Sequence, residues 1–145
     1  MNQADGAAFP ATSASLTMSI LHAAHAIEDR METALGNVGL SIAKHSALSQ
    51  LAKAGEPLTL SELAERLSCV RSNITQLVDR LEADGLVRRV ADPADRRSVR
   101  AELTELGSDK QVAGAAEVAR IQSEIAERLG SSDLGMLESA LSSLE

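Results

Sequence analysis

The chain has almost no cysteine and almost no aromatic residues, and each shortage excludes a class of protein. Cys69 is the only cysteine among 145 residues, so neither an intrachain disulfide nor a thiolate metal cluster can form within one chain. Phe9 is the only aromatic residue. Proteins that bind RNA or single strands stack bases on aromatic side chains, so this class is disfavoured.

Long apolar runs and catalytic sets are also missing. No run approaches the roughly 18 to 20 apolar residues that cross a bilayer, and residues 1 to 10 have no signal-peptide pattern. We therefore expect a cytoplasmic protein with no membrane partner. An enzyme would need a nucleophile with its base, a carboxylate pair or a metal cluster. The sequence has no such spaced set, which predicts no enzymatic activity, no cofactor and no metal ion.

Two isolated features are candidate sensors. His22 and His25 lie one helical turn apart, but two ligands without a third favour ordinary surface or interface histidines over a metal site. Cys69 follows a helix end, at a position where a small apolar residue usually packs. A buried thiol is therefore favoured over a redox sensor.

Charge is unevenly distributed along the chain. The formal net charge is −7, yet residues 66 to 102 carry eight arginines against six carboxylates, a net charge of +2 that leaves −9 for the remainder. Every cation in this segment is arginine, whose forked guanidinium suits phosphate and guanine. A solvated face of mixed charge is the alternative interpretation.

Two helices precede this segment and two short helices lie within or beside it. Apolar residues three or four apart predict a helix from Ser13 to about Leu35, and Ser41 can cap a second helix. Thr59 with Glu62 forms a capping-box pattern that begins a short third helix. A fourth helix follows the Ser68-Cys69-Val70 turn and ends at Asp84, with Gly85 as its left-handed cap. The last two helices, joined by so tight a turn, predict a helix-turn-helix.

The fourth helix has one apolar and one polar side. At 100° per residue, Ile74, Leu77, Val78 and Leu81 share the side that should face the core. The polar residues crowd the N-terminal half of the other side, which is the part of a recognition helix that contacts bases. Any surface helix also shows polar residues outward, so this helix alone does not decide the function.

A charged hairpin comes directly behind that helix. Val99, Ala101 and Leu103 alternate with polar residues, a second run lies at residues 86 to 90, and Asp92-Pro93-Ala94-Asp95 between them is turn chemistry. The turn carries Arg96 and Arg97. A basic tip held beside a recognition helix can reach the adjacent minor groove of DNA.

These motifs together resemble the multiple-antibiotic-resistance regulator (MarR) family. The resemblance covers about Leu58 to Gly107, through Leu63-Ala64-Glu65-Arg66-Leu67, Leu77 to Arg89, Asp92 to Arg97 and Leu103-Thr104-Glu105-Leu106-Gly107. It implies a mainly α (α+β) fold, a winged helix-turn-helix with a two-stranded wing flanked by N- and C-terminal dimerisation helices. It also implies a homodimeric transcription factor, most often a repressor, on a pseudo-palindromic promoter site.

The resemblance also assigns roles to residues. Arg97 is similar to the family's wing-tip arginine that enters the minor groove, and Asp95 resembles the partner that orients it. The residues expected at the major groove and flanking phosphates, with the second wing arginine, are Arg71, Ser72, Asn73, Thr75, Gln76, Arg80 and Arg96. Val70 departs from the family's usual hydroxyl cap, and Ala94 stands where a charged residue is frequent.

Apolar stripes at both ends of the chain predict an interface. After Thr104, a plausible cap, a long helix runs to about Leu129, and Asp133 can cap a last helix bearing Leu134, Leu137, Leu141 and Leu144. The first helix, the long helix and the last helix together have more apolar surface than the winged helix-turn-helix could cover. This favours a homodimer, and packing within one chain is the alternative. We expect a disordered tail at residues 1–12, a dimerisation helix at 13–40, the winged helix-turn-helix at 41–104 and C-terminal dimerisation helices at 105–145.

The predicted function is sequence-specific binding of double-stranded DNA at a promoter, under control of a small-molecule inducer that the sequence does not identify. A winged-helix protein-interaction module without DNA binding is the alternative, because the overall charge is acidic.

Overall fold

The structure is a computed structural model that describes residues 11–68 and 71–145. The chain divides between Arg30 and Met31 into two units. The first described element, α1, is a helix at Ala11–Gly36, so residues 11 and 12 of the predicted tail are helical, and the rest of that tail lies outside the described residues. Among the helices in the described ranges, none is long and apolar enough to span a membrane.

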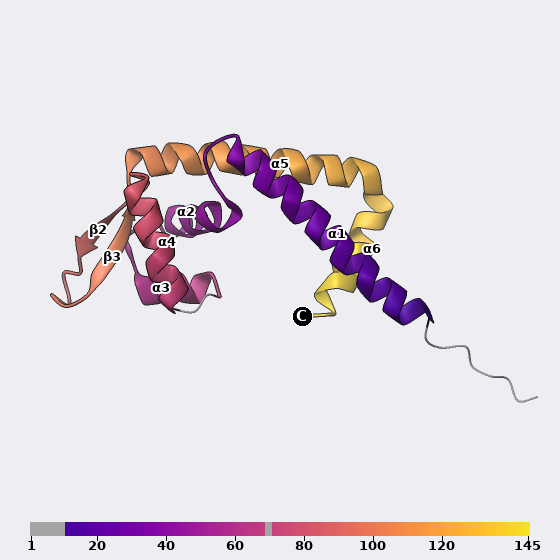
Figure 1. Ribbon diagram of the computed structural model, residues 1–145, viewed down its shortest axis with the longest axis horizontal. Coiled ribbons are helices and arrows are strands. Elements are labelled where there is room, and N and C mark those ends of the chain that lie inside the picture. The colour runs from indigo at the N-terminus through magenta and orange to yellow at the C-terminus, as the bar shows by residue number, and fades with distance from the viewer. Residues whose placement is uncertain (1–10, 69–70) are drawn as a thin grey trace, which may run out of the picture. The chain divides into compact units, whose positions relative to one another are not determined.

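The second unit is a winged helix-turn-helix with two further helices (Figure 1). After the end of α1, its elements are α2 (Ile42–Ala54), β1 (Leu58–Thr59), α3 (Leu60–Arg66), α4 (Arg71–Ala83), β2 (Val87–Ala91), β3 (Val99–Leu103), α5 (Glu105–Leu129) and α6 (Ser131–Ser142). The predicted fold class is confirmed. The sequence did not predict β1, because two residues show no alternation.

The hairpin pairs as expected, and β1 extends it into a three-stranded antiparallel sheet. The strand order is β1-β3-β2, so β3 is central and β2 forms one edge. Ala101 of β3 lies opposite Leu58 on one side and opposite Arg89 on the other. Because Ala101 and Leu58 are buried, this sheet is fastened to the helical core rather than projecting freely.

Local capping chemistry sets most of the helix ends as predicted. Ser41 Oγ accepts the N–H of Lys44, and Thr104 Oγ1 accepts the N–H of Gly107. Thr59 and Glu62 form the complete capping box, and Gly85, with a φ of 73°, takes the left-handed conformation behind α4. The prediction for Asp133 is wrong.

The start of α6 explains that error. Gly130 is the capping residue of α6, and it has no side chain that could accept a capping hydrogen bond. Asp133 instead lies within the first turn of α6, where its negative charge still complements the positive end of the helix dipole.

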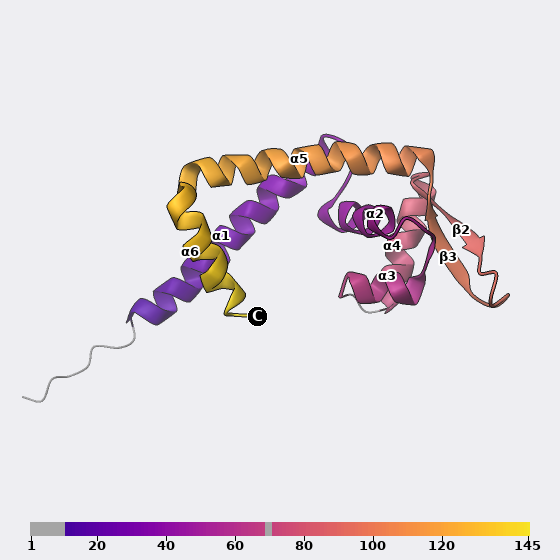
Figure 2. The same ribbon diagram turned by 180° about the vertical axis from the view of Figure 1, so that it is seen from behind.

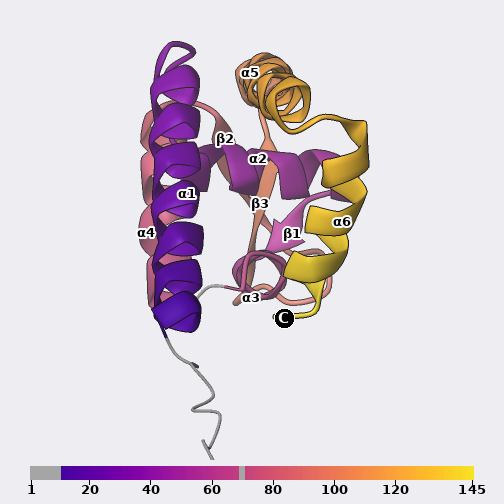
Figure 3. The same ribbon diagram turned by 90° about the vertical axis from the view of Figure 1, so that its right-hand side faces the viewer.

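The core is formed where α2, α3 and α4 meet the sheet. Leu48, Leu63, Ile74, Val78 and Leu81 are fully buried. Leu35, in the last turn of α1, joins the same cluster. Helix α2 lies along α5, as Figures 1 and 2 both show, and Figure 3 looks nearly along α5 with α2 and the sheet below it. This core fixes the positions of α4 and the hairpin.

Helix α6 contributes nothing to that core. It has no buried residue. Met136 is 72 % exposed and Leu144 is 70 % exposed, with Leu137 and Leu141 also open. Leu16, Met18 and Leu21 of α1 are exposed as well. Both terminal helices therefore carry apolar side chains that this single chain leaves in contact with solvent.

A histidine is enclosed between α2 and α5. His45 Nδ1 is buried and has no hydrogen-bond partner among the described residues, whereas its Nε2 lies 3.4 Å from Ser49 Oγ. Gly114 of α5 permits this approach, since a Cβ there would lie 2.5 Å from Nδ1. Burial lowers the pKa of His45 below its ordinary value because the charged imidazolium is poorly solvated there.

We expect the free energy of unfolding to fall between about pH 7 and pH 5. The folded state holds the pKa of His45 below that of the unfolded chain. The unfolded state therefore binds more protons as the pH drops, and stability decreases with it. Urea midpoints at about pH 7.5 and about pH 5.5 measure the change, and His45→Gln should reduce the difference between them. An unchanged difference in that variant would assign the effect to other groups.

Candidate nucleic-acid interface

Helix α4 presents a polar surface to solvent. Ile74, Val78 and Leu81 are fully buried on one side, as the 3.6-residue period predicts. Asn73, Thr75, Gln76 and Arg80, four of the residues expected to contact DNA, are at least partly exposed on the others. The side chains of Arg71 and Ser72 lie outside those that the structure describes, although both residues belong to α4.

Helix α3 supports α4 from beneath. Leu63 and Ala64 of α3 are buried in the same core as the inner face of α4. Since α3 has only seven residues, it depends on this packing and on its capping box for stability. Residues 69 and 70, between α3 and α4 in the sequence, lie outside the described residues. The predicted buried thiol of Cys69 lies outside them as well.

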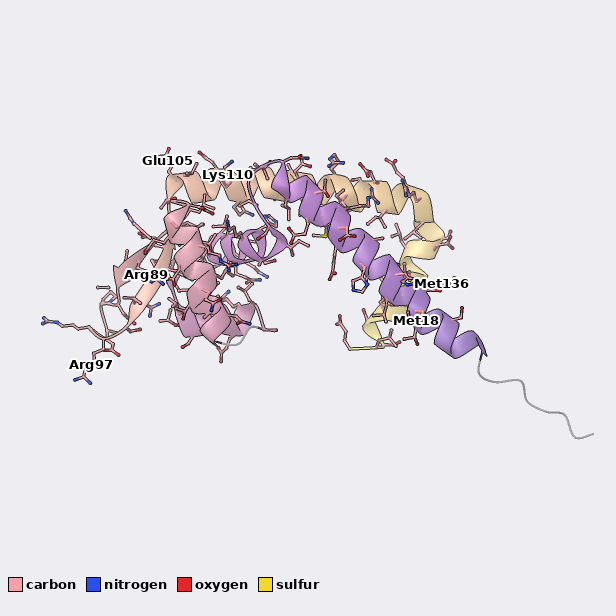
Figure 4. All side chains as sticks on the ribbon, in the orientation of Figure 1. Met18, Arg89, Arg97, Glu105, Lys110 and Met136 are labelled. Carbon is pink, nitrogen blue, oxygen red and sulfur yellow. The ribbon has the colours of Figure 1, made fainter. Side chains whose placement is uncertain are left out.

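The wing turn is held by two aspartates. Asp92 Oδ1 accepts the N–H of Ala94 at 3.0 Å, and Asp95 Oδ1 accepts the N–H of Arg97 at 2.9 Å. Both are Asx turns, in which a side chain imitates a backbone hydrogen bond. Asp95 thus supports the backbone of Arg97 rather than its guanidinium. Figure 4 shows the Arg97 side chain reaching out from the end of the hairpin.

The base of the wing is tied to the start of the helix-turn-helix by Arg100. Its Nε lies 3.3 Å from Asp92 Oδ1, and its Nη1 donates to the carbonyl of Pro57 at 3.1 Å and lies 3.5 Å from Glu62 Oε2. Asp92 is only 8 % exposed. The Ala94 N–H and then the Arg100 guanidinium hold the pKa of Asp92 below its ordinary value. A charged Asp92 therefore locks the wing to the segment that begins α3.

A second arginine joins the wing to α4. Arg89 Nη2 lies 2.5 Å from Asp79 Oδ1 and Arg89 Nη1 lies 2.9 Å from Glu82 Oε1. The other oxygen of Glu82 accepts the backbone N–H of Arg89 at 3.1 Å. These hydrogen bonds, that to Asp79 foremost, raise the pKa of Arg89 above its ordinary value. Figure 4 shows Arg89 beside α4.

Three other cations of the interface are not neutralised in this way. Arg80, Arg96 and Arg97 are exposed, and no carboxylate among the described residues forms an ion pair with any of them. They are therefore available to an anionic partner. No group of three or more metal-ligating side chains is present in the described ranges, and His22 and His25 are both exposed.

The sequence alone did not identify Arg89 and Arg100 as parts of this interface. The alternating strand marks Arg100 only as a polar residue, and Arg89 is only one of eight clustered arginines. The single available signal for Arg89 was the pair of acids at Asp79 and Glu82, three residues apart on one side of a helix. That spacing does not reveal which cation approaches them.

Comparison with known proteins shows which family the winged helix resembles. Residues 38–98 match the model of the MarR family. The HTH-type transcriptional regulator YkoM of Bacillus subtilis (strain 168) is 35 % identical over 85 residues, which are 59 % of this chain and 51 % of YkoM. The chain spans less than two thirds of the length of the curated relatives that it matches first.

Solved structures extend the similarity over most of the chain. AbsC, a MarR family transcriptional regulator from Streptomyces coelicolor, has a TM-score of 0.82 at 26 % identity, with 93 % of each chain covered. A cysteine-to-serine mutant of MarR from Escherichia coli, crystallised with operator DNA, has a TM-score of 0.80 at 23 % identity, over 90 % of this chain and 93 % of MarR. These relatives are transcriptional regulators, not enzymes.

Proposed function

We propose that this chain is a sequence-specific double-stranded DNA-binding transcriptional regulator of the MarR family that acts as a homodimer, since residues 38–98 match the model of that family. Helix α4 enters the major groove, and the β2–β3 wing reaches the adjacent minor groove. In this arrangement Asn73 and Gln76 contact base edges, since their amides can bond adenine at two points. Arg80 and the more N-terminal Arg71, Ser72 and Thr75 meet bases or flanking phosphates.

The observation that carries this proposal is that α4 and the tip of the β2–β3 wing are both exposed on the same chain. The polar residues of α4 from Asn73 onward are open to solvent, and the wing tip carries two arginines with no carboxylate partner among the described residues. A narrow minor groove concentrates negative potential and attracts such side chains. Asp95 fixes the backbone at Arg97 through a 2.9 Å hydrogen bond, so this arginine is held at the tip before DNA binds.

The homodimer is supported by the apolar side chains that the terminal helices leave exposed. Helix α6 exposes Met136, Leu137 and Leu141, and Leu144 just beyond its end is also exposed. Covering these side chains against a second copy would remove this surface from water. A two-fold dimer can place two recognition helices about 34 Å apart, which is one turn of duplex. The corresponding operator is a pseudo-palindrome.

Regulation follows from the same geometry. A small-molecule inducer that changes the separation of the two recognition helices would weaken binding at both half-sites together, because both must match successive grooves. We therefore propose a ligand-responsive repressor located in the cytoplasm. Domain roles follow the sequence prediction, with residues 41–104 reading DNA and residues 13–40 and 105–145 forming the dimer.

A winged-helix protein-interaction module is the second candidate. It is favoured by the net charge of −7 and by the acidic side chains of Asp79 and Glu82 on the reading helix, which phosphates would repel. The two candidates differ in one measurable property. Only a DNA reader has an affinity for duplex that depends steeply on salt.

Gel shifts with the DNA upstream of the chain's own gene, across a salt series, test the proposed function. We expect log K to fall linearly with log salt, with a slope of about −0.9 for each phosphate neutralised. An unrelated duplex of equal length is the control and should bind more weakly by a factor of about 10³ or more. Absent or salt-insensitive binding would contradict DNA reading and favour the interaction module.

A further inference from the structure

Two carboxylates lie on the element that is proposed to enter DNA. Asp79 is 59 % exposed and Glu82 is 43 % exposed, and both belong to α4. Asp79 follows Gln76 by three residues, so their Cβ atoms are only about 5–6 Å apart on the helix surface. If Gln76 touches a base, Asp79 lies within the screening length of about 8–10 Å from the DNA. Bare carboxylates there would repel the backbone.

Arg89 is the group that cancels this repulsion. It is the only arginine in the described ranges that forms ion pairs with both acids, at 2.5 Å to Asp79 and 2.9 Å to Glu82. Its side chain is 25 % exposed, less than either carboxylate. An arginine so enclosed and so fully paired makes a poor phosphate contact, because reaching a phosphate would require breaking both ion pairs.

We propose that Arg89 is a positioning residue for DNA binding, which acts through Asp79 and Glu82 by masking their charges at the surface of α4. This inference rests on the proposed function. The backbone supports the same assignment, since Glu82 also accepts the N–H of Arg89 on edge strand β2. The three side chains thereby form one unit that spans the recognition helix and the wing.

The test compares variants that separate charge from contact. Arg89→Gln leaves two uncompensated acids, and we expect its affinity for operator duplex to fall on the order of tenfold at low salt. The difference should shrink as salt screens the repulsion. Arg89→Lys keeps the positive charge and should retain most of the affinity. The triple variant Asp79→Asn, Glu82→Gln, Arg89→Gln removes all three charges and should restore binding to at least the wild-type level.

Arg120 provides a matched control. On α5 it forms ion pairs with Glu117 at 2.8 Å and Glu124 at 2.7 Å, so Arg120→Gln makes the same change of charge between the same kinds of partner. This helix is not part of the proposed reading surface. Because α5 belongs to the segment proposed to form the dimer, sedimentation must first show that Arg120→Gln has the oligomeric state of the wild type. The control should then bind duplex as the wild type does.

Several results would overturn the masking role. Wild-type affinity in Arg89→Gln would mean that Asp79 and Glu82 need no masking. A triple variant that stays as weak as Arg89→Gln would mean that Arg89 contacts DNA directly or only supports the fold. If Arg89→Gln does not fold by circular dichroism, the pair Asp79→Asn, Glu82→Gln decides. Masking predicts that this pair binds at least as tightly as wild type, and weaker binding refutes it. Wild-type protein that fails to bind any duplex would instead refute the proposed function.

Discussion

Gly107→Ala is expected to lower the free energy of unfolding by about 3 kcal/mol, the largest stability loss that any glycine in the described part of the chain predicts. Gly107 lies in the first turn of α5. A Cβ at this position would lie 1.9 Å from the carbonyl oxygen of Leu86 and 2.8 Å from its carbonyl carbon. Both are backbone atoms, which cannot rotate away as a flexible side chain can.

The backbone around Leu86 is also fixed by its own hydrogen bonds. The Leu86 carbonyl accepts the N–H of Thr104 at 3.1 Å, and the Leu86 N–H donates to the carbonyl of Leu81 at 2.9 Å. Thr104 Oγ1 further donates to the carbonyl of Gly85 at 2.6 Å. Relieving the clash would disturb the junction that joins α4, the wing and α5. The gain in helix propensity from alanine, about 1 kcal/mol, is smaller than this cost.

Urea unfolding measures the effect through the midpoint at constant slope. Gly36→Ala is the matched control, since a Cβ on Gly36 would meet no atom within 4 Å, and it should change stability by less than about 0.5 kcal/mol. A similarly small change in Gly107→Ala would show that α5 can shift away from Leu86 without loss. The close packing inferred at this junction would then be wrong.

Features that depend on neighbours in sequence were predicted well. The capping box at Thr59, the left-handed Gly85 and the cap at Thr104 each require only residues within one turn, and the hairpin requires only alternation around a turn. Asp133 failed because its local pattern competes with Gly130, whose backbone conformation breaks the helix three residues earlier. Several signals can fit one helix start, and the sequence does not rank them.

Features that depend on distant residues were missed. Strand β1 exists because Leu58 pairs with Ala101, far along the chain, and Arg100 reaches Pro57 across the same pairing. Arg89 meets Asp79 and Glu82 only because the turn at Gly85 folds β2 back along α4. Periodicity identifies which face of an element is apolar. It does not state which charged side chains of two different elements approach each other.

The largest effect on DNA binding is expected from Arg97→Ala combined with Gln76→Ala. Each substitution alone should weaken binding to the operator by about 1–3 kcal/mol, which is about fivefold to 150-fold. The two residues belong to different elements, α4 and the wing turn, so their effects should be nearly additive unless they share a contact. Their signatures should differ, however. Gln76→Ala removes the proposed base contact and should relax the choice of base at one position of each half-site.

Arg97→Ala removes the cation that is proposed to enter the minor groove. Its effect should therefore be largest on duplexes with an A·T-rich flank, and the salt slope should fall by about one unit per protomer. Arg128 is an exposed arginine in the last turn of α5, and Arg128→Ala is the control for loss of one positive charge. Provided that sedimentation shows the oligomeric state of the wild type, this variant should keep its affinity within about twofold of wild type. Titrations of fluorescent duplex by anisotropy compare these variants with the wild type. Because Asp95 supports only the Arg97 backbone, Arg97→Ala should leave the wing turn folded. Weakened binding can therefore be assigned to the lost guanidinium, whereas unchanged affinity in the double variant would favour the protein-interaction module.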